Sequence, residues 1–360
     1  MNLPAVIFAA AVAAAISCGV QPLLIRLLRR HAVLDAPNHR SSHRTATPRG
    51  GGIAVVAGVA AGLGAATWLG VTVPGACWFG LVGFAVIGLL EDLRGMSVTA
   101  RLAAQLALGL LIVLLVVDDP GGRVALGVAG MVVAAVLLVA YTNAYNFMDG
   151  LNGISALNTI VVCVAYGVIA TSLGAGGIVV VAAATAAAAA GFLPWNAPRA
   201  RVFLGDVGSY ALGATLGLLG VACFLAGAPL ELCAAPLSVY VADTAWTLVR
   251  RVARRQRWYE AHREHAYQRL TDAGLGHLES AAVTVVAAVL VTLLAQRAVA
   301  LPPLWRLAVD GGAVALLAVY LALPTVMRSR PEVERVEQVE RVEPPDIVPG
   351  VLADQRGVAS

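Results

Sequence analysis

Residues 124–153 read VALGVAGMVVAAVLLVAYTNAYNFMDGLNG, an apolar run that passes directly into a polar motif. Positions 124–140 carry no polar side chain, and a run rich in Tyr, Asn, Asp and Gly follows directly. An apolar helix of about 20 residues spans the hydrocarbon core of a bilayer. The stretch therefore predicts a membrane-spanning helix that ends in a polar motif at the membrane surface.

The composition of the whole chain agrees with this reading. Of its 360 residues, 59% are hydrophobic and 13% are charged, whereas soluble domains are about 45–50% apolar and about 25% charged. These proportions exclude a soluble globular enzyme, a disordered protein and a nucleic-acid-binding domain. The lipid bilayer is the expected environment, and no nucleic acid is expected as a partner.

Apolar stretches recur along the chain with short polar breaks between them. We predict an all-α, polytopic integral membrane protein with about eleven transmembrane helices, which form one domain over residues 1–327. Residues 328–360 are predicted to form a flexible charged tail. The predicted spans are 4–28, 51–70, 73–90, 99–117, 124–144, 154–173, 176–194, 207–226, 230–249, 278–299 and 303–324.

The arginines predict the orientation of these spans. With the N-terminus outside, Arg123, Arg297 and Arg306 fall on the outer side and the remaining 22 of the 25 arginines fall inside. Cytoplasmic loops carry such an excess, so the N-terminus is predicted to be periplasmic. All six histidines fall on the same inner side, which predicts an active site at the cytoplasmic face. The alternative, a transporter or flippase, would place polar residues at both faces and in mid-membrane.

The five cysteines predict no chemistry of their own. They form no CxxC pair and lie mostly in apolar runs, where a free Cys acts as a small hydrophobe. We expect neither a disulfide framework nor a zinc site.

The first polar segment on the inner side is DAPNHRSSHRTATPRGGG, residues 35–52. Arginines and the backbone N–H groups of a Gly-rich turn that enters a helix are suited to bind phosphate, which makes Arg49 a candidate. An ordinary positive-inside loop is the alternative.

The second segment is the pair Glu91–Asp92, whose carboxylates repel each other unless a cation or an Arg lies nearby. The alternative here is a solvated helix end.

Three further segments complete the set. Asn143, Asn146 and Asp149 are spaced by three, so they should line one helix face and could hold Mg²⁺; an Asn-mediated helix contact is the alternative. In RVFLGDVGSYALG, residues 201–213, Asp206 could bind a metal beside a helix N-terminus that receives phosphate, or simply act as an N-cap. Residues 250–270 are densely basic, and either bind phosphate or form an amphipathic segment on anionic lipid.

These five segments, in this order, resemble the polyprenyl-phosphate N-acetylhexosamine-1-phosphate transferases (glycosyltransferase family 4). That membrane family includes bacterial undecaprenyl-phosphate GlcNAc-1-phosphate transferase and phospho-MurNAc-pentapeptide transferase. The resemblance covers about residues 20–275, and its most specific parts are NAYNFMDGLNG, VFLGDVGS and HREHAYQRL. The loop PNHRSSH…TPRGGG is similar to that of the O-antigen-initiating branch.

The resemblance implies an activity and a location. UDP-N-acetylhexosamine and undecaprenyl phosphate would give undecaprenyl-diphosphate-HexNAc and UMP, with Mg²⁺ as cofactor, in the bacterial inner (cytoplasmic) membrane. The product would start a cell-envelope polysaccharide such as O-antigen (lipopolysaccharide) or teichoic acid. A homodimer is one assembly compatible with such a chain.

The resemblance also implies roles for individual residues. It places Asn146 and Asp206 at the metal, and Phe203 where the family stacks uracil. The expected catalytic residues are Glu91, Asp92 and Asp149. The other expected substrate-binding residues are Arg49, Asn152, His262, Arg263 and His265.

Two positions depart from the family pattern. The acidic pair is usually Asp-Asp, and its first member here is Glu91; the motif DGLDG is here DGLNG, with Asn152. Glu reaches one methylene further, and Asn keeps hydrogen-bonding capacity without a charge. These departures fit either a branch with a different sugar donor or a catalytically inactive relative.

Overall fold

The structure is a computed structural model, and it describes residues 2–36, 45–116, 120–257 and 262–328. Residues 37–44 of the first polar segment, which was predicted to bind phosphate, and the predicted tail after Arg328 therefore lie outside the described residues. The helices are α1 (Leu3–Arg30), α2 (Gly52–Trp68), α3 (Gly75–Arg94), α4 (Val98–Val116), α5 (Pro120–Met148), α6 (Ile154–Ser172), α7 (Gly176–Asn196), α8 (Gly205–Leu225), α9 (Leu230–Ala234), the 3₁₀ turn η1 (Ala235–Leu237), α10 (Ser238–Ala253), α11 (Ala266–Asp272), α12 (His277–Ala298) and α13 (Pro303–Arg328). Two short strands, β1 (Leu34–Asp35) and β2 (Thr47–Pro48), pair antiparallel.

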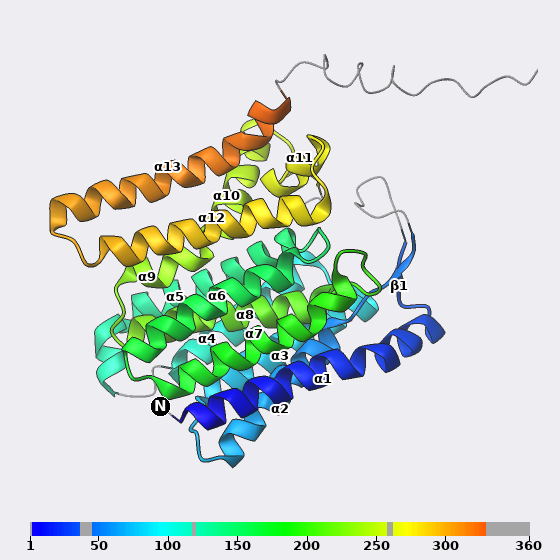
Figure 1. The fold of residues 1–360 in the computed structure, drawn as a ribbon, viewed down its shortest axis with the longest axis horizontal. Helices are drawn as coiled ribbons and strands as arrows, with labels where there is room; N and C mark the ends of the chain where they lie inside the picture. Colours follow the sequence, from blue (N-terminus) through cyan, green and yellow to red (C-terminus); the bar gives the residue numbers. More distant parts are fainter. Residues whose placement is uncertain (1, 37–44, 117–119, 258–261, 329–360) are drawn as a thin grey trace, which may run out of the picture.

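The all-α, polytopic architecture is confirmed. Within the described residues, ten helical segments are long and apolar enough to cross a membrane, with α9, η1 and α10 counted as one. Helix α2 is a shorter apolar helix of 17 residues, so that each of the eleven predicted stretches is helical. Helix α1 begins at one end of the bundle and α13 ends at the other (Figure 1).

Helix α8 lies at the centre of the bundle and α13 at its edge (Figure 1). In α8, 83% of the apolar span is buried within the protein, against 11% in α13. The outward side chains of the outer helices are largely apolar, among them Leu304, Leu307 and Val314 on α13. A bilayer solvates such a surface, so it needs no protein partner.

Glycines let three helix ends meet closely around the start of α8. A Cβ atom added to Gly52 of α2 would lie 2.3 Å from the Cα of Gly208, and one added to Gly88 of α3 would lie 2.1 Å from the carbonyl oxygen of Asp206. Both distances are far below contact distance, so only glycine fits at these two positions. This packing brings the end of α3 and the start of α2 against the residue predicted to bind a metal.

Candidate functional site

A pocket of about 300 Å³ opens at the end of the bundle where α8 begins. Six of the predicted site residues line it: Arg49, Asn146, Asp149, Asn152, Phe203 and Asp206. They come from segments that are up to 157 positions apart in the chain (206 minus 49). The other predicted residues, Glu91, Asp92, His262, Arg263 and His265, do not line this pocket.

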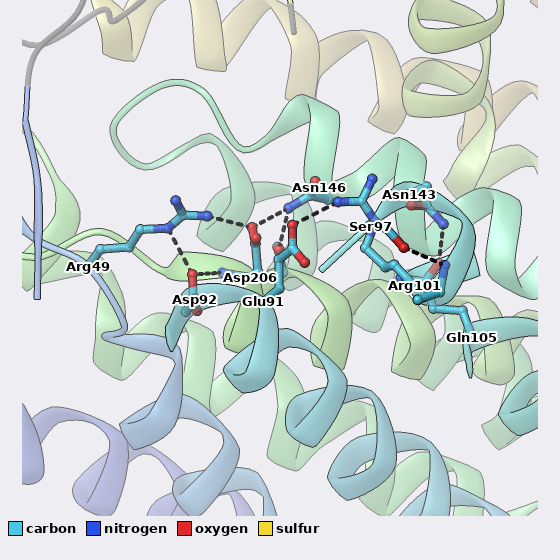
Figure 2. A network of polar contacts seen from close by, with 11 residues as sticks. Arg49, Glu91, Asp92, Ser97, Arg101, Gln105, Asn143, Asn146 and Asp206 are labelled. Carbon is cyan, nitrogen blue, oxygen red and sulfur yellow. Dashed lines mark hydrogen bonds and ion pairs between the residues drawn. The ribbon is translucent and has the colours of Figure 1, made fainter. Parts of the chain in front are cut away.

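Asp206 contacts two other polar side chains of the pocket, Arg49 and Asn146. Its Oδ1 accepts from Nη2 of Arg49 at 2.8 Å and from Nδ2 of Asn146 at 2.8 Å. Asn146 also donates to Oγ of Ser209, one turn further along α8, at 2.9 Å. Figure 2 shows Arg49 and Asn146 approaching Asp206 from opposite sides. Asn146 and Asp206, predicted from separate motifs, thus lie in direct contact.

Asp92 is held beneath this group, not in the pocket. Its Oδ1 accepts the backbone N–H of Asp206 at 3.0 Å, its Oδ2 accepts that of Val207 at 2.9 Å, and Nε of Arg49 lies 2.9 Å from Oδ1. The side chain is 3% exposed. The first N–H groups of a helix have no partner within the helix, so Asp92 of α3 acts as the cap of α8.

This arrangement corrects the prediction that backbone N–H groups would receive phosphate here. The N–H groups of Asp206 and Val207 are occupied by Asp92. In the Gly-rich turn, the N–H groups of Gly50 and Gly51 donate to the carbonyl of Phe203, and that of Gly52 donates to the carbonyl of Leu204. These donors join the loops to each other because the two segments run side by side, which leaves side chains to bind an anion.

Arg49 is the cationic group of the pocket. It follows β2, and a parallel bridge holds its backbone beside Phe203. Burial alone would lower the pKa of the guanidinium, but the nearby carboxylates of Asp206 and Asp92 outweigh burial and raise this pKa. Arg49 is therefore a permanent positive charge, which two carboxylates orient toward the pocket.

Asp149 occupies the turn directly after α5. Its Oδ1 accepts the hydroxyl of Ser155 at 2.6 Å. Burial raises the pKa of Asp149 to about 7, partly offset by the Ser155 hydrogen bond. A carboxyl group with such a pKa exchanges a proton near neutral pH, which suits a group that binds a metal or handles a proton.

Asn143 lies three residues before Asn146 on α5 but does not line the pocket. Its Nδ2 donates to the carbonyl of Val139 and to Oε1 of Gln105 on α4, at 2.8 and 2.7 Å. Asn143 is thus the helix contact that was the alternative interpretation. Glu91 likewise turns to α4, where Arg101 donates to it at 2.9 Å, and Figure 2 shows this second group beside the Asp206 cluster.

Three predicted residues of the motif HREHAYQRL, namely His262, Arg263 and His265, do not line the pocket. His265 is 2% exposed and its Nδ1 lies 3.2 Å from Oδ1 of Asp243. Burial, with His265 and Arg251 nearby, lowers the pKa of His262 to about 4, so His262 is neutral at pH 7. Arg263 forms an ion pair with Asp272 at 3.2 Å.

Four polar side chains among the described residues of the pocket were not predicted as site residues: Asp35, Asn196, Gln268 and His277. Asn196 accepts the N–H of Gly153 at 2.6 Å and donates to the carbonyl of Val202 at 3.1 Å, so it joins the two motif loops. A signal existed for Gln268, which lies inside the motif HREHAYQRL, but the histidines of that motif drew the assignment. Nothing local marked His277, whose Nδ1 lies 3.5 Å from the backbone N of Asn152.

The donor set fits Mg²⁺ bound together with a substrate. Among the described residues no group of three or more His, Cys, Asp or Glu side chains could hold a metal alone. Mg²⁺ commonly takes one or two protein carboxylates and completes its shell with phosphate and water. The carboxylates of Asp35, Asp149 and Asp206 line the pocket. Asp149 and Asp206 could serve as such ligands, with Asn146 beside Asp206.

Comparison with known proteins finds a matching family model and several similar proteins. Residues 75–224 match the family model described as Glycosyl transferase family 4. The chain is 28% identical over 274 residues to a protein of Bacillus subtilis (strain 168) named probable undecaprenyl-phosphate N-acetylglucosaminyl 1-phosphate transferase, which covers 73% of this chain and 76% of that protein.

Two relatives named phospho-N-acetylmuramoyl-pentapeptide-transferase are also similar. The protein of Leuconostoc citreum is 33% identical over 239 residues, 59% of this chain and 73% of its own. That of Mycolicibacterium vanbaalenii is 32% identical over 273 residues, 60% of this chain and 76% of its own. With the apolar helices of the described residues, these matches show that the chain is a multi-pass membrane protein that belongs to glycosyl transferase family 4.

Proposed function

We propose that this protein transfers N-acetylhexosamine-1-phosphate from a UDP-sugar to undecaprenyl phosphate, giving undecaprenyl-diphosphate-HexNAc and UMP. The reaction would take place at the cytoplasmic face of a bacterial inner membrane and start a cell-envelope polysaccharide, such as O-antigen or teichoic acid. The names of two relatives support this class of substrates. One name contains undecaprenyl phosphate and N-acetylglucosaminyl 1-phosphate transfer, and the other contains phospho-N-acetylmuramoyl-pentapeptide transfer.

The observation that carries the proposal is the contact of Asp206 with both Arg49 and Asn146 at a polar pocket. Both substrates are anions, and a guanidinium ion held by two carboxylates offers charge-assisted hydrogen bonds to phosphate oxygens. The pocket also carries uncharged groups, Phe203, Asn152 and Asn196. An aromatic ring and two amides suit the base and the sugar of a nucleotide donor.

The proposed reaction forms one bond and breaks one. An oxygen of the lipid phosphate bonds to the β-phosphorus of the donor, and the bond from that phosphorus to the bridging oxygen breaks, so that UMP leaves. Asp206, Asn146 and Asp149 would hold Mg²⁺, which supplies neutralisation of the diphosphate charge. Arg49 orients the diphosphate. Since the pKa of Asp149 is near 7 without the metal, Mg²⁺ binding would displace its proton.

The rival function is a transporter or flippase of a lipid-linked or anionic substrate. Such a protein needs a polar pathway across the membrane. The charged pocket residues instead gather where α8 begins, at one end of the bundle. The buried residues in the middle of α8 are Ala, Leu and Gly, with Thr215, whose hydroxyl donates to the carbonyl of Ala211 in the same helix. This distribution favours chemistry at one membrane face.

The test is a transfer assay with the purified protein in detergent. Undecaprenyl phosphate, Mg²⁺ and a panel of UDP-N-acetylhexosamine donors are supplied, and UMP release and the lipid product are measured. We expect stoichiometric UMP and undecaprenyl-diphosphate-HexNAc from at least one donor. Absence of both with every donor would reject the proposed function.

A further inference from the structure

Asp243 of α10 lies outside the pocket and is fully buried. Its Oδ1 accepts the backbone N–H of Ala266 at 2.8 Å, and its Oδ2 accepts that of Tyr267 at 3.3 Å. These are the first two N–H groups of α11, which lack partners within that helix. Asp243 therefore caps α11 from another helix, in the same way that Asp92 caps α8.

Helix α13 reaches the same carboxylate. The hydroxyl of Tyr320 donates to Oδ2 of Asp243 at 2.9 Å, and Tyr320 is 3% exposed. Only Tyr320 and Pro324 are buried among the described side chains of α13. A hydrogen bond to a carboxylate is stronger than one between neutral groups. Through Asp243, the outermost helix of the bundle is thus fastened to α11.

Helix α11 in turn forms part of the pocket wall. Gln268 lines the pocket, and its Oε1 accepts the backbone N–H of His265 at 3.3 Å, so the side chain also closes the start of the helix. The hydroxyl of Tyr267 donates to the carbonyl of Phe147 at 2.9 Å, in the last turn of α5. A shift of α11 would therefore move Gln268 and disturb the motif that carries Asn146 and Asp149.

We propose that Asp243 and Tyr320 are positioning residues, which set the place of α11 and thereby hold Gln268 against the uncharged part of the sugar-nucleotide donor. This inference rests on the proposed function for the identity of the donor. It assigns a role in donor binding to α10, α11 and α13, all of which follow the segment that matches the family model, residues 75–224.

The central variant is Tyr320→Phe, which removes one hydroxyl and keeps the ring packing. The KM for the best donor is expected to rise roughly fivefold, with kcat and the KM for undecaprenyl phosphate little changed, because donor binding and not the chemical step is affected. Gln268→Ala should give the same pattern. If Tyr320 acts through Gln268, the double variant should be no worse than Gln268→Ala, since coupled residues are not additive.

Arg306→Gln is the matched control. Arg306 ties α13 to Glu231 of α9, where Nε lies 2.8 Å from Oε1, and neither residue lines the pocket. This variant loosens the same helix at its other end and should leave the donor KM unchanged. Hydrogen–deuterium exchange of residues 262–275 supplies a readout that needs no activity: Tyr320→Phe should speed exchange there, and Arg306→Gln should not.

The outcomes distinguish a failure of the proposed transferase function from a failure of the positioning role of Asp243 and Tyr320. If the wild-type protein releases no UMP with any donor, the proposed function fails, and equilibrium dialysis of UDP-GlcNAc then measures donor affinity directly. Equal donor affinity or KM in wild type and Tyr320→Phe would overturn the positioning role. So would a KM rise in Arg306→Gln of the same size, or additive effects in the double variant.

Discussion

Asp92 on α3 accepts the backbone N–H of Asp206 on α8 at 3.0 Å, 114 positions further along the chain. One carboxylate therefore fixes the position of another through the start of a helix. The negative charge of Asp92 lies at the positive end of the α8 dipole, where an anion is stabilising. The family resemblance implies a catalytic role for Asp92, yet both of its carboxylate oxygens accept hydrogen bonds from the backbone of α8.

The capping role predicts a loss of stability in Asp92→Asn. An amide offers one acceptor where the carboxylate offers two, so a buried N–H of α8 or Arg49 loses its partner, which costs about 1–3 kcal/mol. Thermal unfolding in detergent should show a clearly lower Tm. Glu91→Gln is the control, because its ion pair with Arg101 is partly exposed and weaker. Equal Tm values for the two variants would contradict the capping role.

Asp206→Asn should abolish most activity in a protein that still folds. The variant keeps the size of the side chain and loses the charge that would face Mg²⁺, so kcat/KM should fall by roughly a hundredfold or more. Ser209→Ala removes only a neighbouring contact of Asn146 and should cost far less. The measurement is UMP release against Mg²⁺ concentration. Normal turnover of Asp206→Asn at low Mg²⁺ would show that Asp206 does not bind the metal.

The raised pKa of Asp149 predicts a pH dependence of stability. The folded protein holds the proton up to about pH 7, whereas the unfolded chain releases it near pH 3.8. Between these values the folded state binds more protons, so this group's contribution to stability falls as pH rises and then levels off above pH 7. Asp149→Asn, which cannot ionise, should therefore have a higher Tm than wild type at pH 8 and a similar Tm at pH 4.

The same variant should be nearly inactive, because it removes a carboxylate from the pocket. Tm measured against pH, for wild type and Asp149→Asn in the absence of substrate, isolates the contribution of this one group. A wild-type Tm that exceeds that of the variant by more at pH 8 than at pH 4 would contradict the assignment.

Asn152 is expected to influence which donor is used. Its Nδ2 donates to the carbonyl of Pro198 at 3.0 Å, and Asn152→Asp would place a carboxylate against that carbonyl and add charge near the diphosphate. We expect partial turnover with a changed ranking of UDP-GlcNAc against a 6-deoxy donor such as UDP-FucNAc. Asp149→Asn should be far more damaging. Equal losses in both variants, with the donor ranking unchanged, would show that Asn152 does not recognise the donor.

The orientation of the bundle is tested by cysteine labelling. Ala226 follows α8 at the end away from the pocket, and Arg199 lies at the pocket end; both are exposed. In intact cells, Ala226→Cys should react with an impermeant thiol reagent and Arg199→Cys should not, with the wild-type cysteines as background. The reverse pattern would put the pocket on the outer face of the membrane.

The sequence alone determined the transmembrane architecture. Each of the eleven apolar stretches is helical within the described residues, because backbone groups in lipid must be satisfied within the segment and hydropathy is a local property. It also identified Arg49, Asn146, Asp149, Asn152, Phe203 and Asp206, all of which line one pocket. Short motifs at the ends of apolar spans carried that information, since polar side chains are costly there unless they have a function.

The tertiary structure decided which way each polar side chain turns. Asn143 and His265 belong to the same motifs as pocket residues, yet they bond to Gln105 and Asp243. Asp92 bonds to the start of α8 and does not line the pocket. Gln268 lines the pocket although the histidines of its motif do not, and His277 lines it from outside every motif. Such choices depend on how distant helices pack, because a buried polar group takes whichever partner the neighbouring helix presents, and no local pattern of residues records that neighbour.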